Sequence, residues 1–246
     1  MINIGISGCC GRMGQAITRL AREDNHIRIK TLLEHDGHDQ VGQSLEGITI
    51  SSNPDDLQGC DVFIDFTLPV ATIKNLKACL KHNVQMVIGT TGFKEEERDA
   101  LYEASKKIGM VLSGNMSLGV NILFKLTQIL AKTAPEYYKA SIIEAHHIHK
   151  KDAPSGTAKM LENFIDHANI SNNPNSKRDR KQTESIREGE IIGDHSVTFD
   201  SPEDSLVISH HAKNRDIFAK GALVAAKFIS GKSNGFFDMQ DVLGIK

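Results

Sequence analysis

The sequence predicts an α/β protein that has a doubly wound parallel sheet, followed by a second α+β domain with an open mixed sheet. Short apolar segments alternate with helical segments over residues 1–117, as they do in parallel βαβ units. A glycine-rich turn joins the first of these apolar segments to the first helical one. After residue 117 this alternation ends, and longer helices and polar, histidine-bearing strands follow.

In the first part of the chain, the predicted strands are short and apolar, and the predicted helices lie between them. Parallel strands have this character because both faces of their sheet are covered. The predicted strands are residues 2–7, 27–33, 62–66, 86–88 and 110–113. Apolar residues at helical spacing predict helices over residues 13–22, 71–82 and 95–108.

The second part of the chain no longer alternates short strands with helices, and this change predicts a second domain over residues 118–216. Alternating and β-branched segments predict strands at residues 140–148, 185–192, 195–200 and 205–211. Helices are predicted at residues 120–132, 155–168 and 217–230. Residues 170–181 are polar and predict a loop. We expect the last segment, residues 217–246, to return to the domain formed by residues 1–117.

The composition is that of an ordinary globular protein. Of the 246 residues, 39% are hydrophobic and 24% are charged. The formal net charge of −2 provides no broad basic field for nucleic acid or an anionic membrane. The four cysteines fit neither a zinc motif nor a CxxC pair, and free thiols are typical of a reducing cytoplasm. We see no basic leader and no apolar stretch of membrane-spanning length, so we expect a cytoplasmic protein.

A glycine-rich loop follows the first predicted strand and reads Gly8-Cys9-Cys10-Gly11-Arg12-Met13-Gly14. Glycines let backbone amides approach a pyrophosphate, and a helix start adds free amides and a favourable dipole. The spacing is GxxGxxG, with Cys10 where GxGxxG has its second glycine. The alternative interpretation is a plain tight turn, but the position between a strand and a helix favours dinucleotide binding in a Rossmann-like domain.

Glu34 ends the second predicted strand, at the interval where an acid should meet the adenosine ribose. Its carboxylate can accept hydrogen bonds from the ribose hydroxyls, which favours NADH. A 2′-phosphate would be repelled unless His35 or Arg12 compensates. The alternative is a solvated charge at a strand end.

Two further loops follow predicted parallel strands at residues 65–69 and 89–92. Ligands of open α/β sheets bind at this edge. Gly89 permits close approach of a ring or ribose, and Thr90 and Thr91 offer amides and hydroxyls. Ordinary turns use the same residue types. Asn115 ends the next strand, where a ligand contact and a turn-forming role are equally compatible with the sequence.

Histidines, lysines and a helix start are concentrated in residues 144–158. His146, His147 and His149 lie near a strand end, and Lys150 and Lys151 follow. Residues 155–157, Ser-Gly-Thr, open a helix after a proline, so their amides and hydroxyls can hold an anion. Together these residues predict a site for a carboxylate-bearing substrate with a proton donor. The alternatives are a structural helix cap and a histidine metal site, although no supporting motif such as HExxH is present.

Taken together, these motifs resemble the 4-hydroxy-tetrahydrodipicolinate reductase family, also called dihydrodipicolinate reductase. The segment EAHHxHKxDAPSGTA is highly specific to that family, and the resemblance continues through residues 187–189, 193–195 and 235–239. It implies a Rossmann domain and a second domain that binds substrate and builds a homotetramer. It also implies the reduction of 4-hydroxy-tetrahydrodipicolinate to tetrahydrodipicolinate by hydride transfer from NADH or NADPH. This reaction belongs to diaminopimelate and lysine biosynthesis.

The resemblance also implies roles for individual residues and implies no metal. His146 would be the catalytic proton donor or acceptor, and Lys150 the second proton donor. His147, Gly156 and Thr157 would hold the substrate carboxylates. Arg187 and His195 match the family without an assigned role. The cofactor contacts would be Gly8, Cys9, Cys10, Gly11, Arg12, Met13, Glu34, His35, Gly89, Thr90, Thr91, Ser113, Gly114, Asn115 and Met116.

Two other classes of protein are compatible with parts of the sequence. A dinucleotide-sensing regulator would explain the glycine loop but not the lysines and histidines beside an anion pocket. A histidine-ligated metal hydrolase would explain the histidines but not the glycine loop. Substrate-dependent cofactor consumption separates the first from a reductase, and metal analysis tests the second.

Overall fold

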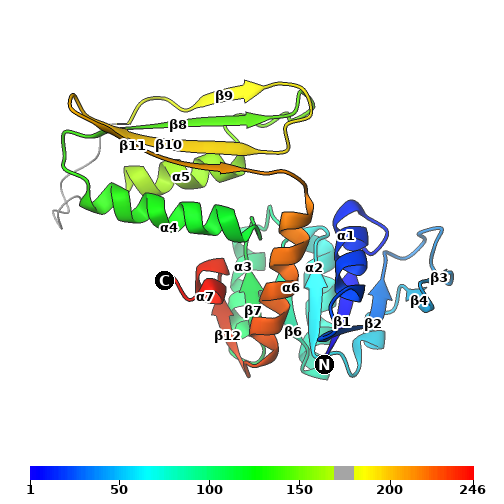
Figure 1. Cartoon of the computed structure of the whole chain (residues 1–246). Helices are drawn as coiled ribbons and strands as arrows, with labels where there is room; N and C mark the ends of the chain where they lie inside the picture. Colours follow the sequence, from blue (N-terminus) through cyan, green and yellow to red (C-terminus); the bar gives the residue numbers. More distant parts are fainter. Residues whose placement is uncertain (169–179) are drawn as a thin grey trace. The chain divides into compact units, whose positions relative to one another are not determined.

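The computed structural model describes residues 1–168 and 180–246, which form two compact units (Figure 1). Unit 1 consists of Met1–Ser117 and Asp216–Gly244, so the C-terminal segment belongs to the same unit as the glycine loop. Unit 2 consists of Leu118–Arg215 and Ile245–Lys246. Of the loop predicted at residues 170–181, all but the last two residues lie outside the described part of the chain.

Unit 1 is built on an eight-stranded sheet in the described residues, with the strand order β12-β7-β6-β5-β1-β2-β4-β3. The pairings are parallel except that between β3 and β4. The strands are β1 (Ile2–Ser7), β2 (Ile27–Leu33), β3 (Ser44–Leu45), β4 (Ile48–Ser51), β5 (Val62–Asp65), β6 (Gln85–Ile88), β7 (Gly109–Leu112) and β12 (Gly235–Phe237). The strand order reverses at β1, which has β2 on one side and β5 on the other. This switch point is where open α/β sheets bind their ligands.

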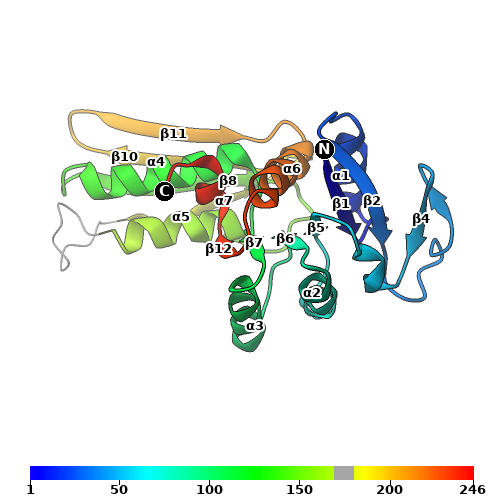
Figure 2. The ribbon, with the colours of Figure 1, turned by 90° about the horizontal axis from the view of Figure 1, so that it is seen from below.

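Helices cover both faces of this sheet, as the doubly wound prediction requires. Figure 2 shows α1 and α6 on one face and α2 and α3 on the other. The helices of unit 1 are α1 (Arg12–Arg22), α2 (Pro69–His82), α3 (Glu95–Ser105), α6 (Asp216–Ser230) and the short α7 (Met239–Leu243), with a 3-10 turn η1 (Pro54–Leu57). The predicted Rossmann-like fold of this part of the chain is therefore confirmed.

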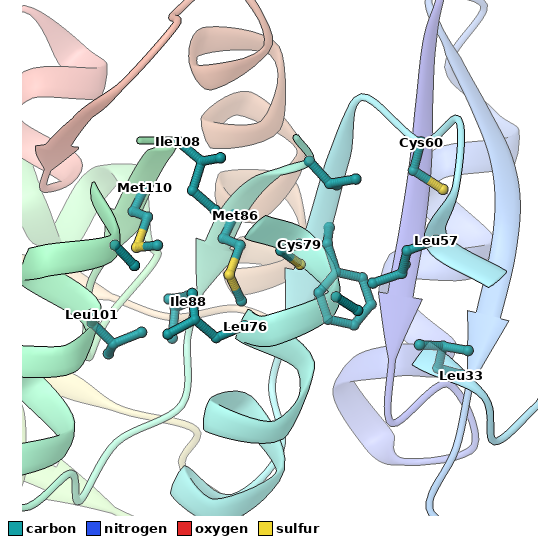
Figure 3. Close-up of a cluster of buried hydrophobic side chains, with 14 of the residues drawn as sticks. Leu33, Leu57, Cys60, Leu76, Cys79, Met86, Ile88, Leu101, Ile108 and Met110 are labelled. Atoms are coloured by element: carbon teal, nitrogen blue, oxygen red, sulfur yellow. The ribbon is translucent and has the colours of Figure 1, made fainter. Parts of the chain in front are cut away.

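The core of unit 1 is continuous between the sheet and α2 and α3 (Figure 3). Strand residues such as Phe63, Met86 and Met110 are fully buried against Leu76 of α2 and Leu101 of α3. Burying each such side chain stabilises the fold by about 1.5–3 kcal/mol. This core fixes the strand ends from which the ligand-binding loops leave the sheet.

Helix α6 packs so closely on the segment after β7 that a side chain would not fit at Gly221. A Cβ atom there would lie 1.7 Å from the carbonyl oxygen of Met116. The C-terminal segment of the chain therefore supports residues 113–116, which the sequence predicts to contact the cofactor.

Unit 2 contains a four-stranded mixed sheet in its described residues, with the order β11-β10-β8-β9. Strand β10 is antiparallel to β8 and β11, whereas β9 is parallel to β8. The strands are β8 (Lys139–His146), β9 (Glu184–Arg187), β10 (Asp194–Asp200) and β11 (Ser205–His211). Helices α4 (Leu118–Thr133) and α5 (Gly156–Asp166) lie on one face of the sheet, and Phe124, Leu161 and Phe199 join the core there (Figure 1). The second α+β domain with a mixed sheet is also confirmed.

Five predicted segments are shorter in the structure, and five short elements were not predicted. The segments predicted at 62–66 and 155–168 end as β5 at Asp65 and as α5 at Asp166. The strand predicted at 185–192 ends at Arg187, because the chain turns at Gly189, whose φ is +49°. The strand predicted at 140–148 ends at His146, and the helix predicted at 95–108 ends at Ser105. The elements without a prediction are β3, β4, η1, β12 and α7, each too short for a clear period. In the described ranges, no helix has the length and apolar character needed to cross a membrane.

Candidate functional site

The glycine loop of unit 1 folds as a tight turn that requires glycine at two positions. Gly8 has a φ of +62°, and its carbonyl accepts a hydrogen bond from the Gly11 amide at 2.9 Å. A Cβ atom on Gly14 would lie 2.1 Å from the Gly8 oxygen, so α1 can approach β1 only with glycine there. Cys10 has no positive φ. For this reason a cysteine is tolerated where GxGxxG has a glycine.

The two cysteines of this loop have different environments. Cys9 is fully buried, its amide donates to the Leu33 carbonyl, and burial raises the pKa of its thiol to about 12. The Cys9 side chain therefore fills space in the core as a neutral thiol. Cys10 instead lines the cavity described below.

Helix α1 begins with its first amides available to a ligand. Its N-cap is Gly11, and within the described residues no side chain caps this end of the helix. The first turn of a helix has amides without intrahelical partners, and they attract anions. This helix start beside the Gly8 turn can hold a pyrophosphate.

Glu34 lies directly after β2 and points its carboxylate toward the glycine loop. Its Oε2 accepts a hydrogen bond from the Cys10 amide at 3.2 Å, and its Oε1 accepts one from the His35 amide at 3.1 Å. These bonds fix the acid at the mouth of the loop, where it retains lone pairs for a ribose.

A cavity of about 480 Å³ lies in unit 1 at the ends of β1, β2 and β5. Its lining includes five of the predicted cofactor residues: Gly8, Cys10, Gly11, Glu34 and His35. It also includes Thr67 of the loop predicted at residues 65–69, and six further polar residues that no sequence motif indicated: Ser7, Asp36, His38, Ser52, Lys74 and Asn75. Nothing in the pattern distinguishes Lys74 from the other lysines of α2.

The other predicted cofactor residues do not line this cavity: Cys9, Arg12, Met13, Gly89, Thr90, Thr91, Ser113, Gly114, Asn115 and Met116. Thr90 and Met116 are buried. The Asn115 Oδ1 accepts from the Ser117 amide at 2.9 Å, which is the turn-forming role. A Cβ atom on Gly114 would lie 3.5 Å from Thr91, so the loops after β6 and β7 lie side by side.

A buried carboxylate, Asp65, ties the loops after β5 and β6 together. Its Oδ1 accepts from the hydroxyls of Thr67 at 2.6 Å and Thr90 at 3.1 Å. Its Oδ2 accepts from the Asn75 amide at 3.3 Å. A buried carboxylate is tolerated only with such partners. Asp65 therefore positions the ligand-facing loops.

In unit 2, the histidine–lysine segment joins the end of β8 to the start of α5. His146 is buried and its Nδ1 is paired with the carboxylate of Glu144. The Lys150 ammonium lies 2.8 Å from Asp152 and is partly exposed. His147 is half-buried, and its amide donates to the Ile191 carbonyl at 2.7 Å.

The start of α5 has the geometry expected of an anion-binding helix terminus. Ser155 is the N-cap and accepts from the Ala158 amide at 3.2 Å. Gly156 is exposed, and a Cβ atom there would contact nothing within 4 Å, so open space lies beside the helix start. Thr157 follows it in the first turn. Capping and anion binding are compatible here, because the cap uses only one of the first amides.

Glu144, His146 and His195 each place one possible metal-ligating atom, a carboxylate oxygen or an imidazole nitrogen, within 4.8 Å of the other two. This arrangement could in principle hold a metal ion. However, the Arg187 guanidinium already donates to Glu144 at 2.8 Å, and the Ser155 amide donates to the same oxygen at 3.3 Å. A divalent cation would have to compete with this arginine. The cluster is therefore suited to holding an imidazole rather than a metal ion.

These features together define a class of protein. Unit 1 has the glycine loop, the acid after β2 and the cavity of a dinucleotide-binding domain. Unit 2 has cations, a helix start and a buried histidine–carboxylate pair, which suit an anionic substrate and proton transfer. The class is the nicotinamide-dependent oxidoreductases.

Comparisons with known proteins identify the family. Residues 2–116 match the family model described as "Dihydrodipicolinate reductase, N-terminus", and residues 119–243 match "Dihydrodipicolinate reductase, C-terminus". A 4-hydroxy-tetrahydrodipicolinate reductase of Nitrosomonas europaea is 41% identical, with all of this chain and 99% of the relative covered. One of Trichlorobacter lovleyi is also 41% identical over the whole of both chains. The chain therefore belongs to the dihydrodipicolinate reductase family.

Solved structures show the same fold. The dipicolinate-bound dihydrodipicolinate reductase from Paenisporosarcina sp. TG-14 has a TM-score of 0.81 and 23% identity, with 98% of both chains covered. An amine dehydrogenase from Mycobacterium smegmatis has a TM-score of 0.67 at 10% identity, with 96% of this chain and 94% of that chain covered. The fold is thus shared with other dehydrogenases.

Proposed function

We propose that the protein reduces 4-hydroxy-tetrahydrodipicolinate to tetrahydrodipicolinate with NADH or NADPH, in diaminopimelate and lysine biosynthesis. The observation that carries this proposal is the segment from Glu144 to Thr157, which combines a buried histidine, a lysine and an open helix start in unit 2. Family membership over the full chain supports the same reaction. The net reaction consumes one substrate, one reduced nicotinamide and one proton, and releases tetrahydrodipicolinate, the oxidised nicotinamide and water.

Unit 1 fits a nicotinamide dinucleotide, because Gly8, with its positive φ, forms the tight turn after β1, and Gly14, without a side chain, lets the start of α1 lie close against that turn. Gly8, Gly11 and the α1 amides would hold the phosphates, and Glu34 would accept hydrogen bonds from the ribose. When bound, the reduced nicotinamide supplies a hydride. The remaining predicted contacts, from Gly89 to Thr91 and from Ser113 to Met116, would bind the other half of the cofactor.

Unit 2 would bind the two substrate carboxylates and supply the groups for proton transfer. The amides of Gly156 and Thr157, the Lys150 ammonium and the His147 imidazole would hold the carboxylates. Binding would draw Lys150 from Asp152, its partner at 2.8 Å, toward the substrate. The Lys150 ammonium can then give a proton to the ring nitrogen, while His146 accepts or relays one.

The cofactor preference that we propose is NADH, with NADPH also used. The negative charge of Glu34 favours ribose hydroxyls over a 2′-phosphate. Asp36 lines the same cavity and adds negative charge, whereas Lys74, His35 and His38, which also line it, can offset part of the repulsion. Dual use follows from this mixture of charges.

The proposed setting is the cytoplasm, in keeping with four free cysteines. We also propose a homotetramer, built through the sheet of unit 2. Strand β11 is at the edge of that sheet and exposes Leu206 and Val207. A mildly acidic chain with a formal net charge of −2 is not suited to nucleic acid.

A spectrophotometric assay with freshly made substrate tests this function. NADH and NADPH are supplied in parallel at equal concentration, with and without substrate. We expect the absorbance of both cofactors to fall only when substrate is present, and kcat/KM to be higher with NADH. Cofactor that is bound but never consumed would instead support the dinucleotide-sensing regulator.

A further inference from the structure

A buried polar network surrounds His146, and it uses residues to which the sequence assigned no role. Glu144, on β8, is fully buried and pairs with the Nδ1 of His146 through its Oε2. Its other oxygen accepts from Arg187 of β9 at 2.8 Å. A charged carboxylate at such a site needs these partners, because desolvation otherwise costs several kcal/mol.

The charge state of this network follows from its contacts. Burial acts to raise the pKa of the Glu144 carboxyl, but hydrogen bonds from Arg187, Ser185 and His146 outweigh it and leave that pKa lowered. Burial lowers the pKa of His146, and Glu144 offsets this only in part. Lys150 and Arg187 add positive charge that opposes protonation of the ring. Glu144 is therefore ionised beside a neutral imidazole.

An ionised carboxylate only accepts hydrogen bonds, so the proton of neutral His146 must lie on Nδ1. The lone pair is then on Nε2, at the opposite edge of the ring. That edge faces Gly193, where an added Cβ atom would lie 3.0 Å from Nε2. A residue with a side chain at position 193 would crowd this atom.

The imidazole ring of His195 packs against that of His146. The two imidazole rings are 5.2 Å apart and meet edge to face, and the His195 Nε2 lies 3.1 Å from the Ser155 hydroxyl. Burial lowers the pKa of His195 to about 4, so it carries no charge at neutral pH. It therefore packs against His146 without contributing a charge of its own.

We propose that Glu144 is the positioning residue of this enzyme: it fixes His146 as the Nδ1-protonated tautomer and so presents Nε2 as the atom that exchanges the proton. Arg187 keeps Glu144 ionised and also donates to the Asp152 carbonyl at 2.6 Å, which ties the Lys150 loop to the same carboxylate. The predicted effect of Glu144 on catalysis rests on the proposed function, whereas the predicted tautomer of His146 does not.

The test compares the wild-type chain with Glu144→Gln. Solid-state ¹⁵N NMR of the full, histidine-labelled protein reads the tautomer, and the His146 signals are identified by their loss in His146→Gln. We expect Nδ1-protonated His146 in the wild type. In Glu144→Gln we expect a shift toward the Nε2-protonated form, and a fall in kcat of about 10- to 100-fold with little change in KM, as for other carboxylates that orient a functional histidine.

Glu162→Gln is the matched control, because Glu162 is also paired with an arginine in unit 2, Arg180, at 3.1 Å. It should retain the wild-type kcat and the wild-type His146 tautomer. A wild-type spectrum with the proton on Nε2 would overturn the proposal whether or not Glu144→Gln folds. So would a Glu144→Gln protein with an unchanged tautomer. Absence of reductase activity in the wild type would instead refute the proposed function and leave the NMR result standing.

Discussion

Replacing His146 or Lys150 by alanine is expected to lower kcat by about 100- to 10,000-fold, the usual range for losing a general acid or base. His146 is the buried imidazole held by Glu144, and Lys150 is the cation that follows it at the end of β8. Neither belongs to unit 1, where the cofactor cavity lies. The dissociation constant for NADH should therefore remain close to the wild-type value. Steady-state kinetics and NADH fluorescence titration measure the two quantities.

Lys151→Ala is the matched control for Lys150→Ala, because it removes an exposed lysine from the next position. It should retain nearly full turnover. Full activity in both His146→Ala and Lys150→Ala would refute the assignment of proton transfer to this segment.

Gly14→Ala is expected to weaken NADH binding by about tenfold to 100-fold. The new methyl group would lie 2.1 Å from the Gly8 oxygen and 2.6 Å from the Cys9 Cα, both of which are backbone atoms that cannot rotate away. Helix α1 must then move from β1, and overpacking of this kind costs about 1–3 kcal/mol. Since 1.4 kcal/mol corresponds to a factor of ten in affinity, the expected tenfold to 100-fold loss corresponds to about 1.4–2.8 kcal/mol, which lies within this range. Calorimetric titration with NADH measures it, and circular dichroism checks the fold.

The control is Gly231→Ala, which adds the same methyl group where the nearest heavy atom is 4.0 Å away. Its NADH affinity should be that of the wild type. Unchanged affinity in Gly14→Ala would mean that the contact between α1 and β1 does not shape the cofactor site.

The fold was largely predictable from local pattern. The limits of β2 and β11 agree with the predicted residues 27–33 and 205–211, because β-branched segments bounded by turn residues carry a clear signal. Helix α1 agrees with the predicted residues 13–22 to within one residue, because its apolar residues recur at helical spacing. Strands β3 and β12 have two and three residues, and such short elements form only because a neighbouring strand is present to pair with them.

The polar side of the site was less predictable, because its partners are distant in the sequence. Arg187 lies 43 positions from Glu144, and only the pairing of β9 with β8 brings them together. Lys74 looks like any exposed helix lysine until α2 is placed beside the glycine loop. His146 and Lys150 could be selected in advance because their motif is local. The contacts that hold His146 could not.

Transfer of deuterium from the cofactor shows whether the protein reduces its substrate by direct hydride transfer. The chain is supplied with NADH that carries deuterium at both C4 positions of the nicotinamide, together with unlabelled 4-hydroxy-tetrahydrodipicolinate, and the product is analysed by mass spectrometry. Direct hydride transfer predicts tetrahydrodipicolinate that has gained a single deuterium, bonded to carbon. Unlabelled product, or no product while NADH remains intact, would refute the proposed reduction.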